Sequence, residues 1–365
     1  MPRTPSATRI TRTARATTAV AVLATLAAGL AACSVDGGGD SSDAAADKTV
    51  VVASHDSWAM SKKVLADFTR TTGYTVTVQP NGDAGELTNK LVLTKRSPIA
   101  DMTYGIDNTF ASRAVDAGIL AENTPKDEPA SAAAYALPDA QAAAELTPID
   151  YGDVCVNVDD AWFDQHGKTP PRTLDDLTRP AYRDLFVTPG AATSSPGLAF
   201  LLATIAKYGD GWPAYWKKLM ANGTKLTAGW SDAWDVDYTA GGGDGDRPIV
   251  LSYASSIPDT IPKGASRPTT HALLDTCFRQ VEYAGVLKGA RNPAGARAFI
   301  DFMSGRTFQE ALPDNMYVYP VDDAAPLPAT WKLFAKVASS PFTLPPSEIA
   351  ANRDRWLRQW GDVTS

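Results

Sequence analysis

The strongest constraint on the fold is a regular alternation of strand-like and helix-like segments in the first third of the chain. Three short runs are rich in Val, Thr and Tyr, which is typical of strands. They cover residues 49–54, 74–79 and 100–104. Each is followed by apolar residues at helical spacing, in residues 59–71, 84–94 and 110–117. This order predicts an open, mostly parallel α/β sheet.

Two of the predicted strands lead into loops that carry acidic residues. Asp56, Ser57 and Trp58 follow the first strand, and Asp107 and Asn108 lie in the loop predicted at residues 105–108. Ligands of open α/β sheets bind beyond the carboxyl ends of the strands. Each aspartate could complement a positive ligand or could cap the next helix. The sequence leaves both readings open.

A second α/β unit is predicted between about residues 152 and 278. Its strand-like runs cover residues 153–158, 185–187 and 248–253. Helices are predicted at residues 198–208 and 212–220. A further strand, residues 276–283, returns the chain, and three helices follow. These helices are predicted at residues 294–303, 308–312 and 347–360.

Residues 227–234, Thr-Ala-Gly-Trp-Ser-Asp-Ala-Trp, are predicted to end a strand and begin a helix. Trp230 and Trp234 are four residues apart, so a helix places both on one face. Aromatic pairs at this spacing usually pack into a core. With Ser231 beside them and Tyr253 at the end of an apolar run, the rings could instead grip a flat organic cation.

A Ser-Ser-Pro-Gly segment precedes the helix predicted at residues 198–208. Ser195 is predicted to cap this helix, with Pro196 as the first helical residue. Free backbone N–H groups at such a start could bind a phosphate or a carboxylate. Ser194 and Ser195 are therefore candidate binding residues, and an ordinary helix cap is the alternative.

The charge of the chain argues against nucleic acid as a partner. The net charge is −7, and no acid balances the four arginines of the first 32 residues. Without that segment the balance is −11, which favours a cationic ligand or simple solubility.

Catalytic motifs are not found in the sequence. The three histidines are isolated from one another, and no HExxH, CxxC, GxSxG or phosphate-binding glycine motif occurs. The acids at residues 235–246 do not match a calcium loop and read as a solvated turn. We therefore expect no enzyme activity, no cofactor and no metal. A secreted hydrolase would need a nucleophile and a base that the motifs do not reveal.

The N-terminus carries a basic segment and then a short apolar run, which indicates a secretory signal peptide over residues 1–32. The run is Ala-rich and short against the ~20 residues that a membrane span needs. Leu30-Ala-Ala-Cys33 resembles a bacterial lipobox, which implies cleavage before Cys33 and a lipid on its thiol. Residues 33–47 then read as a flexible tether. The protein is expected at the outer face of the cell membrane.

Two further cysteines lie in predicted strands. Cys155 and Cys277 could form a disulfide in an oxidising compartment, or could remain as two buried thiols.

Six ordered motifs together carry a family resemblance over about residues 48–362. They are Gly105-Ile-Asp-Asn108, Asp150-Tyr-Gly152, Thr193-Ser-Ser-Pro-Gly-Leu198, Thr227-Ala-Gly-Trp-Ser-Asp-Ala233, Leu251-Ser-Tyr253 and Tyr319-Pro-Val321. In this order they resemble the thiamine-binding lipoproteins and periplasmic proteins of ABC transporters. The resemblance implies a two-lobed α/β fold, the type 2 periplasmic-binding-protein fold, with a ligand cleft between lobes that close on the ligand.

The resemblance also implies a division of the chain into domains. Lobe 1 would comprise residues 48–151 and 279–325, and lobe 2 residues 152–278. The strands near Cys155 and Cys277 would cross between the lobes. Residues 326–365 would form a C-terminal helical segment that packs on the lobes.

Roles for individual residues follow from the same resemblance. Trp230 and Tyr253 would form aromatic walls, Asp56 and Asp107 would contact the heterocycles, and Ser195 would face the hydroxyethyl or phosphate end. Tyr317 stands where relatives carry Trp, and His55 where several carry Tyr. The full set of expected ligand-binding residues is Asp56, Ser57, Trp58, Asp107, Asn108, Ser194, Ser195, Trp230, Ser231, Tyr253 and Tyr317.

The implied function is that of a monomeric, lipid-anchored receptor. It would deliver thiamine or thiamine phosphates to the permease of an ABC importer. A receptor of the same fold for another solute, a polyamine or ferric iron, is the alternative.

Overall fold

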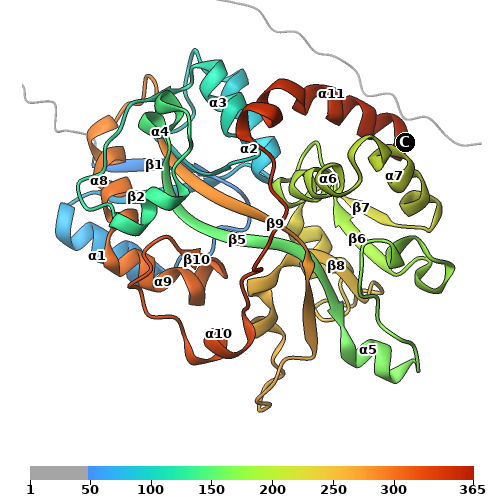
Figure 1. Cartoon of the computed structure of the whole chain (residues 1–365). Helices are drawn as coiled ribbons and strands as arrows, with labels where there is room; N and C mark the ends of the chain where they lie inside the picture. The colour runs from blue at the N-terminus through green and yellow to red at the C-terminus, as the bar shows by residue number, and fades with distance from the viewer. Residues whose placement is uncertain (1–47) are drawn as a thin grey trace, which may run out of the picture. The chain divides into compact units, whose positions relative to one another are not determined.

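The computed structural model describes residues 48–365 (Figure 1). The predicted signal peptide, lipidated Cys33 and tether lie outside the described residues. The strands of the described part form one hydrogen-bonded sheet, with the order β2-β1-β3-β9-β5-β8-β6-β7. Two short strands, β4 (Leu120–Ala121) and β10 (Tyr319–Pro320), pair with β9 and β5 away from this path.

Each end of the sheet is a parallel group, as the strand–helix alternation predicted. The first group contains β1 (Thr49–Ser54), β2 (Thr75–Pro80) and β3 (Met102–Asp107). The second contains β6 (Phe186–Pro189), β7 (Lys225–Thr227) and β8 (Ile249–Tyr253). Crossover helices between the strands keep both groups parallel.

Two long antiparallel strands join the groups, β5 (Thr147–Asp159) and β9 (Thr270–Leu287). β9 pairs with β3 and β5 pairs with β8, so the sheet runs through both halves of the described chain. Figure 1 shows both strands passing from one half to the other. β5 and β9 carry Cys155 and Cys277, so they are the strands that the family resemblance implied would cross between the lobes. The predicted boundaries at residues 152 and 278 fall inside these strands.

A disulfide links the two long strands. Cys155 of β5 and Cys277 of β9 are bonded, with their Cα atoms 4.2 Å apart. Two residues away on each strand, the Arg279 guanidinium binds the buried Asp153 carboxylate. The sequence allowed either a disulfide or two free thiols, and the structure has the disulfide. The bond lies where the strands cross between the halves.

The helices cover the sheet and bury its apolar residues. In the first half they are α1 (Lys62–Thr72), α2 (Ala84–Leu93), α3 (Ala111–Ala117), α4 (Ala140–Glu145), α8 (Pro293–Ser304) and α9 (Arg306–Met316). In the second half they are α5 (Asp160–Gln165), α6 (Ser195–Tyr208) and α7 (Trp212–Ala221). Short 3₁₀ segments cover Ala130–Tyr135, Asp176–Thr178, Pro180–Tyr182, Gly209–Gly211 and Ala254–Thr260, the last labelled η6, and Asp232–Asp237 forms π-helix η5.

Two boundaries differ from the sequence prediction. The helix expected from residue 59 begins at Lys62, because the Ser61 hydroxyl caps it by accepting the Val64 N–H. The loop expected at residues 105–108 is strand as far as Asp107. There β3 continues past a bulge and pairs Ile106 with Tyr283.

The C-terminal segment contains α10 (Ala329–Phe334) and α11 (Pro346–Thr364). In α11 the Trp360 ring meets Trp216 of α7 edge-on, with ring centroids 5.6 Å apart. Arg353 Nη1 of the same helix donates to Ser112 Oγ of α3 at 3.1 Å. The helix therefore contacts both halves, as Figure 1 shows. No helix within residues 48–365 has the length and apolar character required to cross a membrane.

Candidate ligand-binding site

A cavity of about 340 Å³ lies where loops from both halves meet. It is bordered by the loop after β1, the first turns of α2 and α6, and the segments that follow β7 and β8. Residues at the end of α9 and one side chain of β9 complete it. The loops lie at the carboxyl ends of the parallel strands, as predicted. The volume falls within the range of ~300–1,000 Å³ that is usual for small-molecule sites.

Stacked indole rings form one wall of the cavity. The Trp230 and Trp234 centroids are 5.7 Å apart, with 13° between the ring planes. Trp234 is only 3% exposed, whereas Trp230 is half-buried. Trp230 Nε1 donates to Ser252 Oγ at 2.9 Å, which fixes the ring. Trp234 is therefore a core residue, which was one of the two predicted alternatives for this pair. Trp230 presents its ring to the cavity.

Tyr253 stands beside these indoles, with its centroid 6.5 Å from that of Trp230 and the planes 60° apart. Its hydroxyl donates to Gln280 Oε1 at 3.2 Å. Gly152 of β5 makes room for the ring, because a Cβ there would lie 2.7 Å from Tyr253 Cδ1. The glycine of the Asp150-Tyr-Gly152 motif thus positions an aromatic wall.

Tyr317 also borders the cavity, at the end of α9. It holds a left-handed backbone conformation, with φ of 55°, which is uncommon for a residue other than glycine. The Ser255 hydroxyl donates to the Tyr317 carbonyl at 2.7 Å and supports this turn. Burial and a hydrogen bond with Asp259 raise the pKa of the Tyr317 phenol to about 12.

The cavity is strongly acidic. Five carboxyl groups line it, from Asp56, Asp83, Asp235, Asp259 and Glu282. Among the described residues that border the cavity, none is Lys or Arg. Partial burial, together with neighbouring carboxylates, raises the pKa of both Asp56 and Asp235. A positive ligand would relieve this mutual repulsion.

Glu282 at the floor of the cavity belongs to a buried polar cluster on β3, β5 and β9. Asp150 of β5 lies opposite Glu282 of β9. The Tyr104 hydroxyl donates to Asp150 Oδ2 at 2.6 Å and approaches Glu282 Oε2 at 3.1 Å. Burial, followed by the Glu282 charge, raises the pKa of Asp150 well above its usual value.

His55 borders this cluster. Its Nδ1 is 2.8 Å from Ser57 Oγ, and its Nε2 is 3.8 Å from Glu282 Oε1. Within the described part of the chain, the buried Nε2 atom has no hydrogen-bond partner. Buried polar atoms are normally satisfied, so a polar atom of a ligand could complete this position.

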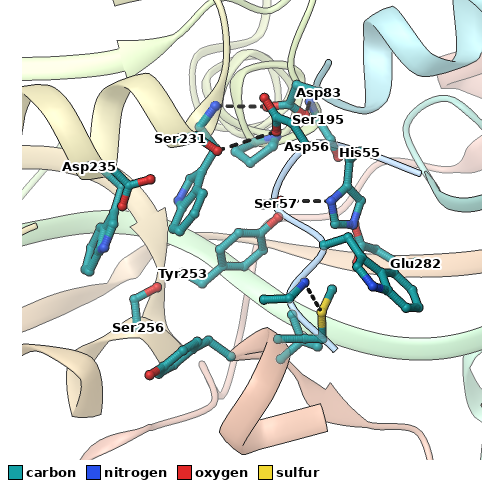
Figure 2. A pocket seen from close by; sticks show the side chains of 18 of the residues that line it. His55, Asp56, Ser57, Asp83, Ser195, Ser231, Asp235, Tyr253, Ser256 and Glu282 are labelled. Carbon is teal, nitrogen blue, oxygen red and sulfur yellow. Dashed lines mark hydrogen bonds and ion pairs between the residues drawn. The ribbon is translucent and has the colours of Figure 1, made fainter. Parts of the chain in front are cut away.

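The start of α6 differs from the sequence prediction. Ser194, rather than Ser195, caps the helix by accepting the Gly197 N–H at 3.3 Å. Ser195 is the first helical residue. Its N–H donates to Asp83 Oδ1 at 3.1 Å and its hydroxyl donates to Asp107. The predicted cap was thus wrong by one residue. The Asp83 carboxylate lies beside Ser195 at this helix start, as Figure 2 shows.

Three of the expected ligand-binding residues do not border the cavity. They are Ser194, Asp107 and Asn108. Asp107 is fully buried and accepts the Thr109 and Phe110 N–H groups, in the turn that leads into α3. Burial raises the pKa of Asp107 to about 7. Asn108 accepts the Val281 N–H through Oδ1 at 3.1 Å and so holds β9.

The other eight expected residues border the cavity: Asp56, Ser57, Trp58, Ser195, Trp230, Ser231, Tyr253 and Tyr317. Sequence reasoning missed Asp83, Ser256, Asp259 and Glu282, which also border it. Asp83 follows a strand and precedes a helix, as Asp56 does, so the same rule could have found it. Glu282 and Asp259 carry no comparable local signal.

A metal centre is not visible in the described chain. No group of three or more His, Cys, Asp or Glu side chains within residues 48–365 is arranged to hold a metal ion.

Comparisons with known proteins find a matching family model and several relatives. The model of the family described as bacterial extracellular solute-binding protein matches residues 97–333. The thiamine-binding periplasmic protein of Salmonella typhimurium is 29% identical over 284 residues, 78% of this chain and 82% of the relative. Its counterpart in Brucella suis is 28% identical over 329 residues, which cover 88% of this chain and 94% of the relative.

A solved structure agrees with these relatives. A periplasmic thiamin binding protein superimposes with a TM-score of 0.76 at 26% identity, and covers 87% of this chain and 96% of its own. This likeness confirms the predicted type 2, two-lobed α/β fold.

Proposed function

Because the chain belongs to the bacterial extracellular solute-binding protein family, we propose that it is the thiamine receptor of an ABC importer. The observation that carries the proposal is the cavity itself, which combines indole and phenol rings with five carboxyl groups and no bordering Lys or Arg among the described residues. Relatives named for thiamine binding support the choice of ligand.

The chemistry of thiamine suits this cavity. Its thiazolium ring is a permanent cation, which aromatic faces and carboxylates both attract. Its aminopyrimidine ring is flat and carries both donors and acceptors of hydrogen bonds. The stacked Trp230 and the Tyr253 ring offer surfaces for the flat rings, and Glu282 and His55 offer polar partners at the floor.

The proposal extends to how the receptor acts. Processing before Cys33 would leave a lipid-anchored monomer at the outer face of the membrane. Lobe 1 (residues 48–151 and 279–325) and lobe 2 (residues 152–278) would close on the ligand and present it to the permease. The protein would bind its ligand without converting it.

Calorimetric titration of the purified protein with thiamine tests the proposal. We expect a Kd below about 1 µM, or roughly −8 kcal/mol. Trp230→Ala should weaken binding because it removes a cavity wall, whereas Trp162→Ala, remote from the cavity lining, should not. Absence of heat with thiamine would refute the proposal. Binding of spermidine instead would identify a polyamine receptor.

A further inference from the structure

Three carboxyl groups lie in a row across neighbouring strands of the sheet. Glu282 of β9 is the strand partner of both Asp107 on β3 and Asp150 on β5. Side chains of directly opposed residues point to the same face of a sheet, with Cβ atoms about 5 Å apart. All three side chains are buried, and of the three only Glu282 borders the cavity. A ligand in the cavity therefore meets this carboxyl row through Glu282.

Lysine and arginine side chains do not neutralise the carboxyl row. Within residues 48–365, none of them forms an ion pair with any of its three members. The nearest basic group is the His55 imidazole, whose Nε2 lies 3.8 Å from Glu282 Oε1. Figure 2 shows His55 beside Glu282. Like charges placed opposite each other on neighbouring strands are destabilising, so full ionisation of the row is unfavourable.

The hydrogen bonds of the carboxyl row point to the same conclusion. Asp107 accepts two backbone N–H groups and the Ser195 hydroxyl. Asp150 accepts only the Tyr104 hydroxyl, and within the described part of the chain its buried Oδ1 atom has no partner. A buried carboxylate with so few donors is unfavourable unless it holds a proton. Burial, followed by the Glu282 charge and a hydrogen bond with Glu282, accordingly raises the pKa of Asp150.

The other titratable groups that face the carboxyl row are three phenols and one imidazole. Tyr104 lies on β3, Tyr253 on β8 and Tyr283 on β9. Burial, followed by carboxyl groups of the row, raises the pKa of all three phenols, so they stay protonated at neutral pH. His55, in the loop after β1, is the remaining group, and imidazoles exchange protons in the neutral range. The test below therefore has to separate it from the carboxyl groups.

We propose that the carboxyl row holds a proton while the cavity is empty and releases it to solvent when a cationic ligand binds beside Glu282. This inference rests on the proposed thiamine-binding function, and it names the proton exchange that accompanies binding at that site. A cation near Glu282 favours the ionised form of neighbouring carboxyl groups. One positive charge then enters the buried site as another leaves it. Asp107 and Asp150 are positioning residues, because they act through Glu282 without bordering the cavity.

The test counts protons during calorimetric titration with thiamine at pH 7. Titrations in phosphate and in Tris, whose ionisation enthalpies differ, give the number of protons exchanged. The wild-type protein should release between about 0.3 and 1 proton per thiamine bound. Because the free protein then holds more protons than the complex, the Kd should fall as the pH rises from 6 to 8. One released proton corresponds to about a tenfold change per pH unit.

Asp150→Asn removes one acid from the carboxyl row and keeps the shape of the side chain. Proton release should fall by at least half, and the pH dependence of the Kd should flatten with it. A purely structural defect would weaken binding at every pH without changing the proton count. Asp107→Asn shortens the row from its other end and should act in the same direction. It carries the test if circular dichroism shows that Asp150→Asn does not fold.

Two control variants separate the carboxyl row from the other groups. Asp259→Asn also removes a carboxyl group that borders the cavity, but one outside the row. It should release as many protons as the wild type, even where its affinity differs. His55→Gln removes the imidazole beside Glu282 and should also keep the release. Loss of the release in His55→Gln, together with full release in Asp150→Asn, would assign the proton to the imidazole and overturn the inference.

The remaining outcomes are distinguishable. Thiamine binding without proton release, or with proton uptake, overturns the inference and leaves the proposed function intact. Unchanged release in both Asp107→Asn and Asp150→Asn also overturns it. Absence of thiamine binding removes the proposed function and this inference together.

Discussion

At the scale of single residues, Asp107 supports the cavity without bordering it, because it binds the Ser195 hydroxyl. Its carboxyl group is fully buried and fixes both the turn before α3 and the Ser195 hydroxyl. Burial raises its pKa to about 7. A buried carboxylate is costly unless it is well paired, so its protonation matters for stability near neutral pH.

We predict that Asp107 makes the folded state lose stability as the pH rises. Between about pH 4 and 7 the folded protein holds a proton that the unfolded chain has released, so the free energy of unfolding falls by up to about 1.4 kcal/mol per pH unit. Asp107→Asn removes this dependence, while its amide can still donate to Ser195. Urea unfolding from pH 5 to pH 8 should show the variant gaining stability relative to the wild type. A constant difference across this range would contradict the prediction.

The sequence could identify the cavity residues that directly follow strands. Asp56, Trp230 and Tyr253 each end or follow a predicted strand, so their place at the carboxyl edge of a sheet was predictable. Glu282 was not, because it borders the cavity only through the pairing of β9 with β3 and β5. The roles of the resembling motifs came from family likeness rather than from the residue pattern.

At the scale of elements, the strands and helices of the parallel groups were largely predictable from local pattern. The single continuous sheet was not. It depends on β5 and β9, whose bonded cysteines are 122 residues apart in sequence. Such pairings leave no local signal, because alternation within a strand does not identify its partner.

The close approach of α2 to α6 gives a prediction at this scale. The Glu86 N–H donates to the Thr193 carbonyl at 3.2 Å, and a Cβ on Gly85 would lie 2.6 Å from that oxygen. Gly85→Ala should hold the two lobes apart and weaken ligand binding by about tenfold or more, while alanine favours the helix by ~1 kcal/mol. Calorimetry should show the lost affinity, and a thermal melt should show a folded protein. Gly361→Ala is the matched control, because a Cβ added at Gly361 meets open space. Gly118→Ala is unsuitable as a control, because the φ of Gly118 is positive.

At the scale of the whole molecule, the acidic balance of the chain reinforces the acidic cavity. The net charge is −7, and five carboxyl groups border the cavity. Long-range attraction of a cation is screened by salt, with a Debye length of ~8 Å at physiological ionic strength. The approach of the ligand should therefore depend on salt more than its final contacts do.

We predict that the association rate of thiamine falls as sodium chloride rises from low to high concentration, measured by stopped-flow tryptophan fluorescence. The dissociation rate should change less. Asp235→Asn should flatten the salt dependence, because it removes an exposed charge at the cavity rim. A salt-independent association rate would show that steering does not operate.

The bond between Cys155 and Cys277 has a further consequence for the integrity of the chain. It encloses residues 156–276 in a covalent ring that contains the exposed Gly242–Asp244 segment. A protease that nicks this segment once would not release either fragment, because the bond holds them together. The nicked product should migrate as one species on a denaturing gel until a reductant is added, and then as two.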